Sequence, residues 1–385
     1  MSTPPEPIKA SIIEPVGCHG GMNPYDFNLC HGLSTCGVAA ALFTSDLTTA
    51  PGEPLDAREV YQGAFGRDPV WLRAFRYVRG TFAALAASVS EGRRICHFHF
   101  FRVGLLELMN VTLARLLLRK VIITAHDVES FAKDEAVPGL PRFVYGMAHA
   151  VIAHNQISRQ ELLHKVGLPD HKIHVIPAGN HLAALSSLPS PEQARQALGL
   201  AAAGPFILFF GQIKEVKGLD LLLEAMPAIL AAHPGATLVI AGRPWKMDFS
   251  SYQQQIERLG IGSHCVTHIR FIESAELPLY FQASDLIALP YRRIYQSDVA
   301  LMAMSYGKAV VTSDIPGMTE LIEDGCTGFT FCSGEPASLS ATINKALASR
   351  ELRDAVAERG QQLMSNNYSW SSICTTTAGV YRSCL

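Results

Sequence analysis

Residues 206–218 read Phe-Ile-Leu-Phe-Phe-Gly-Gln-Ile-Lys-Glu-Val-Lys-Gly. The first five residues are a short apolar run, as in a buried strand of a parallel sheet, and Gly211 follows the run directly. From residue 219 to residue 230 the apolar side chains recur at helical spacing, which predicts an amphipathic helix. A strand, a loop bracketed by glycines and a helix in this order predict one unit of a parallel α/β fold.

The same alternation of a short apolar run and a longer helical pattern recurs along the whole chain. In the first part we expect strands at residues 10–14, 38–44, 95–100, 121–125, 150–153 and 173–176. In the second part we expect strands at residues 206–210, 236–241, 266–271, 286–289 and 309–312. The pattern predicts an α/β protein with two doubly wound parallel sheets, each Rossmann-like.

The length of 385 residues predicts two or three domains, at ~150 residues per domain. Residues 180–205 are rich in Ser, Pro and Ala, with one short periodic piece at about 191–198, and we predict an interdomain linker there. Near the end of the chain, Trp370, Ile373 and Tyr381 stand at roughly helical spacing, which predicts a terminal helix.

Composition and charge exclude several classes of protein. Hydrophobic residues make up 48% of the chain and charged residues 17%, which predicts packed cores rather than disorder. Lys and Arg number 32 against 34 Asp and Glu, so no overall positive charge indicates nucleic-acid binding. The nine cysteines include no C-x-x-C pair, which favours free thiols over disulfides or a zinc site. Since the pattern shows neither a signal peptide nor a membrane-spanning helix, we expect a cytoplasmic protein.

Functional residues are expected directly after the strands, because ligands of doubly wound sheets bind beyond the carboxyl ends of the strands. After the first strand come His19, Gly20 and Gly21, then a predicted helix that carries Tyr25. The glycines would let backbone amides approach a substrate at the start of this helix. A tight turn without a ligand is the alternative, and the dinucleotide fingerprint G-x-G-x-x-G is absent.

The pair His126-Asp127 follows the predicted strand at residues 121–125. An imidazole or a carboxylate in this position can hydrogen-bond sugar hydroxyls or accept a proton. In the alternative interpretation, Asp127 caps a following helix and His126 packs against the linker.

The loop at residues 211–218 carries the strongest local signal for anion binding. Gly211 permits close backbone approach, and Lys217, just before the predicted helix, supplies a positive charge for phosphate oxygens. A surface lysine without a ligand is the alternative, which the two bracketing glycines and the position after a strand disfavour.

A second anion site is predicted after the strand at residues 286–289. Ser297 is placed to cap a helix that Gly307 ends, and the amides at that helix start would face a ligand. Asp298 complicates this prediction, because a carboxylate in the first turn interacts favourably with the helix dipole but repels a bound phosphate.

Several stretches of the second half match one family in order and spacing. They read Phe-Phe-Gly-Gln-Ile-Lys-Glu-Val-Lys-Gly at residues 209–218, Leu-Val-Ile-Ala-Gly at 238–242, Ala-Ser-Asp-Leu-Ile-Ala-Leu-Pro-Tyr at 283–291, Ala-Met-Ser-Tyr-Gly-Lys-Ala-Val-Val at 303–311 and Glu-Leu-Ile-Glu-Asp-Gly at 320–325. This half resembles the nucleotide-binding domain of the retaining glycosyltransferases of family 4, which have the GT-B fold.

The first half resembles the acceptor domain of that family more loosely, through the glycine turn at residues 17–21, the pair His126-Asp127 and residues 175–179. Trp370 lies in a stretch that resembles the closing helix of the family, which crosses back onto the N-terminal domain. The resemblance implies three parts, namely an acceptor-binding domain at residues 1–185, a nucleotide-sugar-binding domain at 186–365 and a terminal helix at 366–385 that packs back on the first domain.

Enzymes of this family transfer a sugar, commonly a hexose, from a nucleotide diphosphate donor to a hydroxyl and retain the anomeric configuration. The resemblance implies a role in glycan or polysaccharide assembly, with a glycan or a lipid-linked molecule as acceptor. It also implies no cofactor and no metal, which agrees with the absence of an Asp-x-Asp motif and of a His/Cys cluster with ligand spacing. Positive charge and helix amides would then stabilise the leaving diphosphate.

The resemblance also implies roles for single residues. Lys217 is expected at the diphosphate, with Gln212 where the family usually has arginine and Lys214 partly compensating. The expected donor-binding set is Gly211, Gln212, Lys214, Lys217, Tyr291, Ser297, Asp298, Val299 and Glu320. The reaction centre is expected at His126 and Asp127, and the acceptor is expected at His19, Gly20, Gly21 and Tyr25.

Some positions depart from the family pattern. The two glutamates of the family's E-x7-E motif align with Ile294 and Met302, whose side chains cannot bind hydroxyls. A branch of the family with a Tyr-Gln-Ser-Gly phosphate loop also lacks these glutamates, and this chain resembles that branch but has Asp298 in place of the glycine. A degenerate, non-catalytic partner subunit is therefore the alternative to an active transferase, and a nucleotide-sugar epimerase with the same fold is a third hypothesis.

The segment from residue 73 to residue 120 suggests a further partner. Its basic residues outnumber its acidic ones and stand among aromatic and aliphatic side chains. Such a flank would rest on an anionic membrane at its inner face and receive a lipid-linked acceptor. Solvated arginines on ordinary helices are the alternative.

Overall fold

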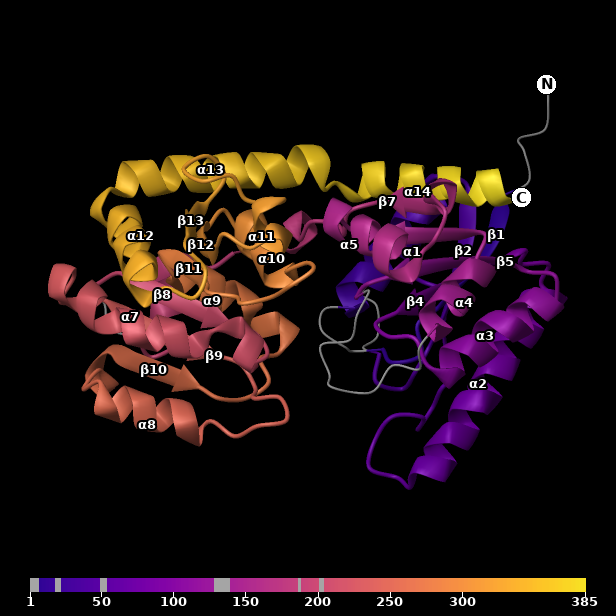
Figure 1. Cartoon of the computed structure of the whole chain (residues 1–385), viewed down its shortest axis with the longest axis horizontal. Coiled ribbons are helices and arrows are strands. Elements are labelled where there is room, and N and C mark those ends of the chain that lie inside the picture. The colour runs from indigo at the N-terminus through magenta and orange to yellow at the C-terminus, as the bar shows by residue number, and fades with distance from the viewer. Residues whose placement is uncertain (1–6, 18–21, 49–53, 128–138, 186–187, 201–203) are drawn as a thin grey trace. The chain divides into compact units, whose positions relative to one another are not determined.

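The computed structural model describes residues 7–385 except 18–21, 49–53, 128–138, 186–187 and 201–203. The chain divides into two compact units. The first unit comprises Met1–Gly179 and Tyr368–Leu385, and the second comprises Asn180–Asn367. Each unit has a parallel sheet with helices packed against it, which confirms the predicted α/β fold class (Figure 1).

In the first unit the described residues form a seven-stranded sheet with the order β3-β2-β1-β4-β5-β6-β7. Its strands are β1 (Ile8–Ile13), β2 (Val38–Thr44), β3 (Ala57–Glu59), β4 (Ile95–Phe100), β5 (Lys120–Ala125), β6 (Ala150–Ala153) and β7 (Ile173–Val175). Its helices are α1 (Met22–Thr35), α2 (Val70–Ser90), α3 (Leu105–Leu116), α4 (Leu140–Met147), α5 (Gln156–Glu161) and α14 (Trp370–Cys384).

Two layers of helices cover the sheet of the first unit. Helices α1 and α14 share one core, in which Leu29 and Leu33 pack with Ile373 and Tyr381. Helices α2 and α3 lie side by side (Figure 1). They belong to the other layer, where the hydroxyls of Ser11 in β1 and Ser88 in α2 are 2.7 Å apart.

Side chains of β4 alternate between the two faces, as in any strand. Ile95 belongs to the core shared with α1 and α14, and His97 and His99 point the same way, toward Tyr381 and Asp26 respectively. The strand therefore presents two histidines, rather than two apolar side chains, to the layer formed by α1 and α14.

In the second unit the described residues form a six-stranded parallel sheet with the order β10-β9-β8-β11-β12-β13. Its strands are β8 (Phe206–Phe210), β9 (Thr237–Ala241), β10 (Cys265–His268), β11 (Leu286–Leu289), β12 (Ala309–Ser313) and β13 (Phe329–Phe331). Its helices are α6 (Pro191–Ala197), α7 (Leu219–Ala232), α8 (Ser250–Arg258), α9 (Leu277–Ala283), α10 (Asp298–Ser305), α11 (Pro316–Thr319), α12 (Pro336–Ala348) and α13 (Arg350–Asn367). Its core lies largely under α7 and α12, where Leu222 and Met226 pack with Leu339 and Ile343.

All the predicted strands are present, and the structure adds two more. Strands β3 and β13 have three residues each and lie at the edges of their sheets. Strand β3 reads Ala-Arg-Glu and has no apolar run, and β13 reads Phe-Thr-Phe, which is too short to stand out as an alternating pattern. The equally short β7 was indicated because it belongs to the longer run at residues 173–176. The strand predicted at residues 266–271 is shorter than expected and ends at His268.

The described part of residues 180–205 belongs to the second unit. Helix α6 is anchored by Arg195, which donates to Asp285 at 3.0 Å and to the Ala283 carbonyl at 3.0 Å. The guanidinium of Arg195 also lies 4.7 Å from the ring centroid of Phe206. The polar composition that suggested a linker comes in part from the capping box at Ser190, which starts α6.

Candidate functional site

The strand order reverses between β1 and β4 in the first sheet, and between β8 and β11 in the second. Ligands of doubly wound sheets bind outside the carboxyl ends of the strands at such points. Each unit therefore has its own candidate site. In the first unit the site consists of residues at the ends of β1, β4, β5 and β6, and in the second of residues that follow β8 and β11.

Residues 211–218, called the lysine loop below, join β8 to α7. The Ile213 amide donates to the Arg243 carbonyl at 3.0 Å, and the Ile213 carbonyl accepts from the Trp245 amide at 3.0 Å. Near the other end of the loop, the Arg292 amide donates to the Val216 carbonyl at 2.8 Å. The lysine loop is thus held between the segments that follow β9 and β11.

Two glycines allow the lysine loop to lie this close to its neighbours. Gly218 has a φ of +68°, and a Cβ atom at this position would lie 1.9 Å from the carbonyl oxygen of Pro290. Gly211 has a φ of +103°, and a Cβ atom there would lie 3.3 Å from Cγ2 of Val299 in α10. Glycine adopts such φ values without strain, so the loop can approach both segments.

We expect the Gly218→Ala variant to lose at least ~2 kcal/mol of unfolding free energy, from the left-handed backbone and the contact with Pro290 together. Urea unfolding measures this loss. Gly260→Ala is the matched control, because Gly260 has a φ of +67° and no described atom lies within 4 Å of a Cβ built there. Equal losses in the two variants would mean that the contact with Pro290 has no effect.

Both lysines predicted for phosphate binding have their ammonium groups over aromatic rings. Lys217 Nζ lies 3.8 Å from the ring centroid of Tyr291, and Lys214 Nζ lies 4.5 Å from that of Trp245. The negative face of an aromatic ring attracts a cation in this position. Tyr291 is buried, and burial raises the pKa of its hydroxyl, so the ring beside Lys217 stays neutral.

Helix α10 begins as predicted, with Ser297 as its cap. The Ser297 hydroxyl oxygen accepts from the Ala300 amide at 3.2 Å, which confirms the N-cap, and the helix ends two residues before Gly307. Helix N-termini attract anions, because the first amides of a helix have no intrahelical acceptor.

The carboxylate of Asp298 has a partner that the sequence did not reveal. Asp298 Oδ1 accepts from His181 Nε2 at 2.8 Å, and the His181 amide donates to the Ser305 hydroxyl at 3.0 Å. Burial disfavours the imidazolium, but the Asp298 carboxylate outweighs this and raises the pKa of His181. When protonated, His181 balances the charge of Asp298 at the start of α10. The two residues are 117 positions apart, and no local pattern connects them.

The remaining donor-binding candidates are placed as follows. Gln212 and Val299 are half-buried, within the lysine loop and the first turn of α10 respectively, whereas Glu320 is exposed just after α11. Met302, at one of the aligned glutamate positions, is buried within α10, so that position serves packing. The structure thus brings Gly211 close to Val299, and Lys217 to Tyr291.

In the first unit, the aromatic ring of Tyr25 lies at the centre of a group of histidines. Its centroid is 5.4 Å from that of His99, 5.3 Å from that of His126 and 5.6 Å from that of His154. Phe101 stacks on His126, with a centroid distance of 4.7 Å and an interplanar angle of 15°. The structure therefore brings together two of the predicted residues, Tyr25 and His126.

The other residues predicted for the site of the first unit are Asp127, His19, Gly20 and Gly21. Asp127 is half-buried and follows His126 at the end of β5. His19, Gly20 and Gly21 lie outside the described residues.

Sequence reasoning missed four buried polar residues beside Tyr25, namely Glu14, Asp26, His99 and His154. A signal for three of them was present. Glu14 and His154 lie two residues after Ile12 and Ile152, and His99 lies four residues after Ile95, so each continues the face that these isoleucines present to α1 and α14. Polar side chains at the carboxyl ends of such faces are therefore a second sequence signal, besides the residues that follow the strands.

Burial keeps these groups largely uncharged. Burial raises the pKa of Asp26 well above its usual value and lowers the pKa of His99 to about 4, although Asp26 Oδ1 lies 3.0 Å from His99 Nδ1. Burial, and then the neighbouring Asp26, raise the pKa of Glu14 to about 8. The Glu14 carboxyl accepts from the amides of Val16 and Gly17, so it holds the turn after β1. The surroundings of Tyr25 are thus polar but close to neutral.

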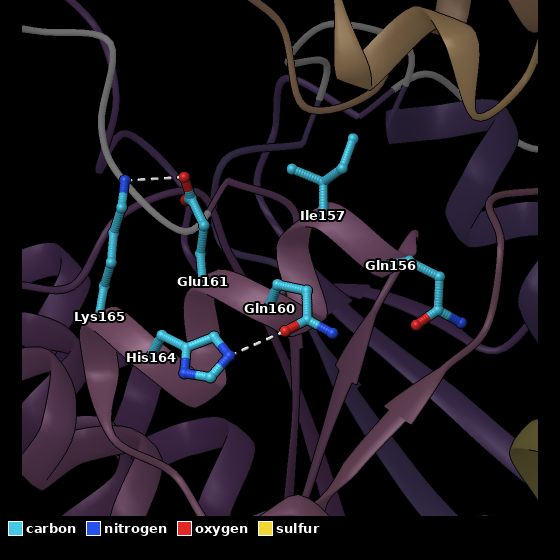
Figure 2. Close-up of a pocket in the computed structure, with 6 residues that line it drawn as sticks. All are labelled: Gln156, Ile157, Gln160, Glu161, His164 and Lys165. Carbon is cyan, nitrogen blue, oxygen red and sulfur yellow. Dashed lines mark hydrogen bonds and ion pairs between the residues drawn. The ribbon is translucent and has the colours of Figure 1, made fainter.

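A surface hollow of about 370 Å³ lies along one face of α5 and of the π-helix Leu162–Val166 that continues it. Figure 2 shows that the polar side chains of its wall pair with each other, His164 with Gln160 and Lys165 with Glu161. These groups are engaged locally, so the hollow is a weaker candidate for a polar ligand than the strand ends. Among the described residues, no group of three or more His, Cys, Asp or Glu side chains could hold a metal ion.

Comparison with known proteins identifies both halves of the chain. Residues 19–183 match the model described as Glycosyltransferase Family 4, and residues 190–363 match the model described as Glycosyl transferases group 1. The D-inositol 3-phosphate glycosyltransferase of Jonesia denitrificans is 25% identical over 95% of this chain and 91% of its own length.

Solved structures share the fold. Sucrose-phosphate synthase from Thermosynechococcus elongatus superposes with a TM-score of 0.79 at 19% identity, covering 97% of this chain and 98% of that one. HepE of Anabaena, solved in complex with UDP-glucose, superposes with a TM-score of 0.76 at 20% identity, covering 97% of this chain and 99% of that one. These neighbours assign the GT-B fold to this chain.

Proposed function

Because the chain belongs to glycosyltransferase family 4, we propose that it transfers a sugar from a nucleotide diphosphate-sugar to a hydroxyl acceptor, with retention of the anomeric configuration. The observation that supports this most is the pairing of Lys217 with Tyr291 beside the start of α10. In this proposal Lys217 neutralises the diphosphate, and the first amides of α10 bind its distal phosphate, as in the branch with a Tyr-Gln-Ser-Gly loop.

Departure of the nucleoside diphosphate creates negative charge, which a fixed ammonium and helix amides can stabilise without reorganising. We propose that this arrangement replaces a metal ion, and that the protein needs no cofactor. Gly211, Gln212 and Lys214 would contact the donor from the lysine loop, and Glu320 would contact it from the end of α11. The acceptor would bind at Tyr25 together with His19, Gly20 and Gly21, with His126 and Asp127 at the reaction centre.

Binding of nucleotide sugars tests the proposal. A thermal-shift panel would contain uridine, guanosine and adenosine diphosphate sugars, and HepE, as a fold neighbour solved with UDP-glucose, suggests the first compound. A ligand at ~100 times its dissociation constant adds about 2.7 kcal/mol to stability. One nucleotide class should raise the melting temperature in the wild type and fail to do so in Lys217→Ala. A panel in which none binds would contradict the proposal.

Donor affinity should fall as pH rises through the pKa of His181. Deprotonation leaves the Asp298 carboxylate unbalanced near the diphosphate, and like charges ~4 Å apart repel by about 1 to 4 kcal/mol, so we expect a fall of at least ~5-fold. Because the folded pKa of His181 is raised, the stabilisation from the pair is complete below the unfolded pKa of about 6.5 and disappears as pH rises through the folded value.

Calorimetric titration of the nucleotide across this pH range measures the effect. Asp298→Asn should bind the nucleotide with an affinity that no longer depends on the ionisation of His181. Asp298→Gly recreates the Tyr-Gln-Ser-Gly sequence of the family branch and should behave in the same way. A pH dependence that persists unchanged in Asp298→Asn would show that the His181–Asp298 pair is not its cause.

We also propose that the first unit rests on an anionic membrane. Helix α2 exposes Trp71, Phe75 and Phe82, whose exposed fractions are 72%, 62% and 55%. Arg79 is exposed between them. Helix α3 lies beside α2 (Figure 1). It exposes Leu105 and Leu116. No described helix is long and apolar enough to cross a bilayer. Aromatic side chains interleaved with arginines match the interface of an anionic bilayer, from which a lipid-linked acceptor would be taken.

Sedimentation with phosphatidylcholine vesicles, with and without phosphatidylglycerol, tests this surface. The double variant Trp71→Ser/Phe75→Ser should bind anionic vesicles at least ~10-fold more weakly, because each buried aromatic contributes about 1.5 to 3 kcal/mol. Phe271→Ser is the matched control, since Phe271 is an exposed aromatic of the second unit. Equal binding to both kinds of vesicle would contradict the proposal. Self-association of the protein without lipid would indicate that this surface binds a second copy of the chain instead of a membrane.

A further inference from the structure

The imidazole of His154 is hydrogen-bonded through both nitrogens. Its Nδ1 lies 2.9 Å from the carbonyl oxygen of Ile176, and its Nε2 lies 3.1 Å from Nδ1 of His126. A carbonyl oxygen can only accept, so Nδ1 of His154 must carry the proton and donate it. The remaining nitrogen, Nε2, then determines how His154 interacts with His126.

Two protonation states are compatible with the bond to Ile176. A neutral His154 has a lone pair on Nε2 and accepts from His126, whereas a doubly protonated His154 donates to His126. The side chain of His154 is 6% exposed, and burial lowers its pKa to about 4. The neighbouring His99 is also buried and disfavours a second positive charge. Near neutral pH, His154 is therefore the acceptor, and Nδ1 of His126 is the donor.

We propose that His154 is a positioning residue that holds His126 as the Nδ1–H tautomer and so leaves the lone pair of His126 on Nε2. The rings of Phe101 and Tyr25 pack against His126 and fix its plane. Ile176 in turn is fixed by its own amide, which donates to the Ala153 carbonyl at 2.9 Å. A chain of contacts from the end of β7 through His154 thus sets which nitrogen of His126 is basic.

The tautomer determines which chemical group His126 can recognise. An Nε2 lone pair accepts a hydrogen bond from a hydroxyl and can take its proton, whereas an Nε2–H would donate to a carbonyl or phosphate oxygen. The inference rests on the proposed function of His126 at the reaction centre. It specifies that the group His126 meets is a hydroxyl of the sugar or of the acceptor, and not a phosphate.

Long-range proton–nitrogen NMR of the ¹⁵N-labelled, ligand-free chain tests the tautomer directly, with the His126 signals assigned by their loss in His126→Gln. We expect Nδ1 of His126 to carry the proton in the wild type. His154→Gln keeps a donor and an acceptor in one amide and should preserve this state. His154→Leu removes both and should populate the Nε2–H form. The exposed His164→Gln is the control.

Kinetics give the second readout. His154→Leu should lower kcat about 10- to 100-fold with little change in the donor KM, and His154→Gln should recover most of the loss. A wild-type His126 protonated at Nε2, or a tautomer unchanged in His154→Leu, would overturn the inference. If His154→Leu does not fold, the NMR spectra of the wild type and of His154→Gln still show which nitrogen of His126 carries the proton. The spectrum needs no substrate, so a wild type without transferase activity would refute the proposed function and leave the tautomer result standing.

Discussion

Replacing Lys217 by alanine should lower kcat/KM for the donor about 100- to 1000-fold, the effect of removing one fixed group that stabilises developing charge. The leaving diphosphate carries that charge, and the Lys217 ammonium is held 3.8 Å from the buried ring of Tyr291. Because the ring of Tyr291 already holds the Lys217 side chain in the free protein, ordering this side chain costs little conformational entropy when the donor binds.

Steady-state assays of diphosphate release measure this effect. Lys217→Arg should be intermediate, since it keeps the charge but cannot sit over the ring in the same way. Lys345→Ala is the control, because Lys345 is an exposed lysine of α12 in the same unit. Undiminished turnover in Lys217→Ala would show that the diphosphate does not bind at the lysine loop.

His126→Ala should lower kcat by a factor of about 10² to 10⁴, the range expected for a group that exchanges a proton or a hydrogen bond with the reacting hydroxyl. Its effect should differ in kind from that of Lys217→Ala. His126 belongs to the first unit, whereas the proposed diphosphate site belongs to the second, so the affinity for the nucleoside diphosphate should be unchanged.

Calorimetry with the nucleoside diphosphate and single-turnover assays with the complete donor separate these two quantities. The exposed His164→Ala serves as control for a lost imidazole in the same unit. A His126→Ala variant with wild-type kcat would place the reaction centre elsewhere, and one that lost nucleotide affinity would assign His126 to the donor site.

Most of the fold follows from local patterns. The runs at residues 206–210 and 286–289 are bounded by glycine, proline or a helical pattern, and the structure has strands there with the same bounds. The strand ends then indicate where ligands bind, which is how Lys217, Ser297 and His126 can be selected from sequence. Local patterns fail for β3 and β13, since pairing at a sheet edge, rather than propensity, makes those strands.

The parts of the site that could not be predicted depend on contacts between distant residues. His181 pairs with Asp298 because the chain entering the second unit is fixed on α10, through the bond from the His181 amide to Ser305. His154 meets His126 because β5 and β6 are neighbours in the sheet. Asp298, taken alone, repels a phosphate, and only its partner shows how that charge is balanced.

Sugar transfer by the purified chain is the measurement that bears most directly on the proposed function. The nucleotide sugar that stabilises the protein most would be incubated with hydroxyl acceptors, while nucleoside diphosphate release and the anomeric configuration of the product are followed by NMR. We expect release that depends on acceptor and on Lys217, and a product with the anomeric configuration of the donor. Tight binding of the nucleotide sugar with no transfer to any acceptor would contradict this and identify a non-catalytic binding subunit.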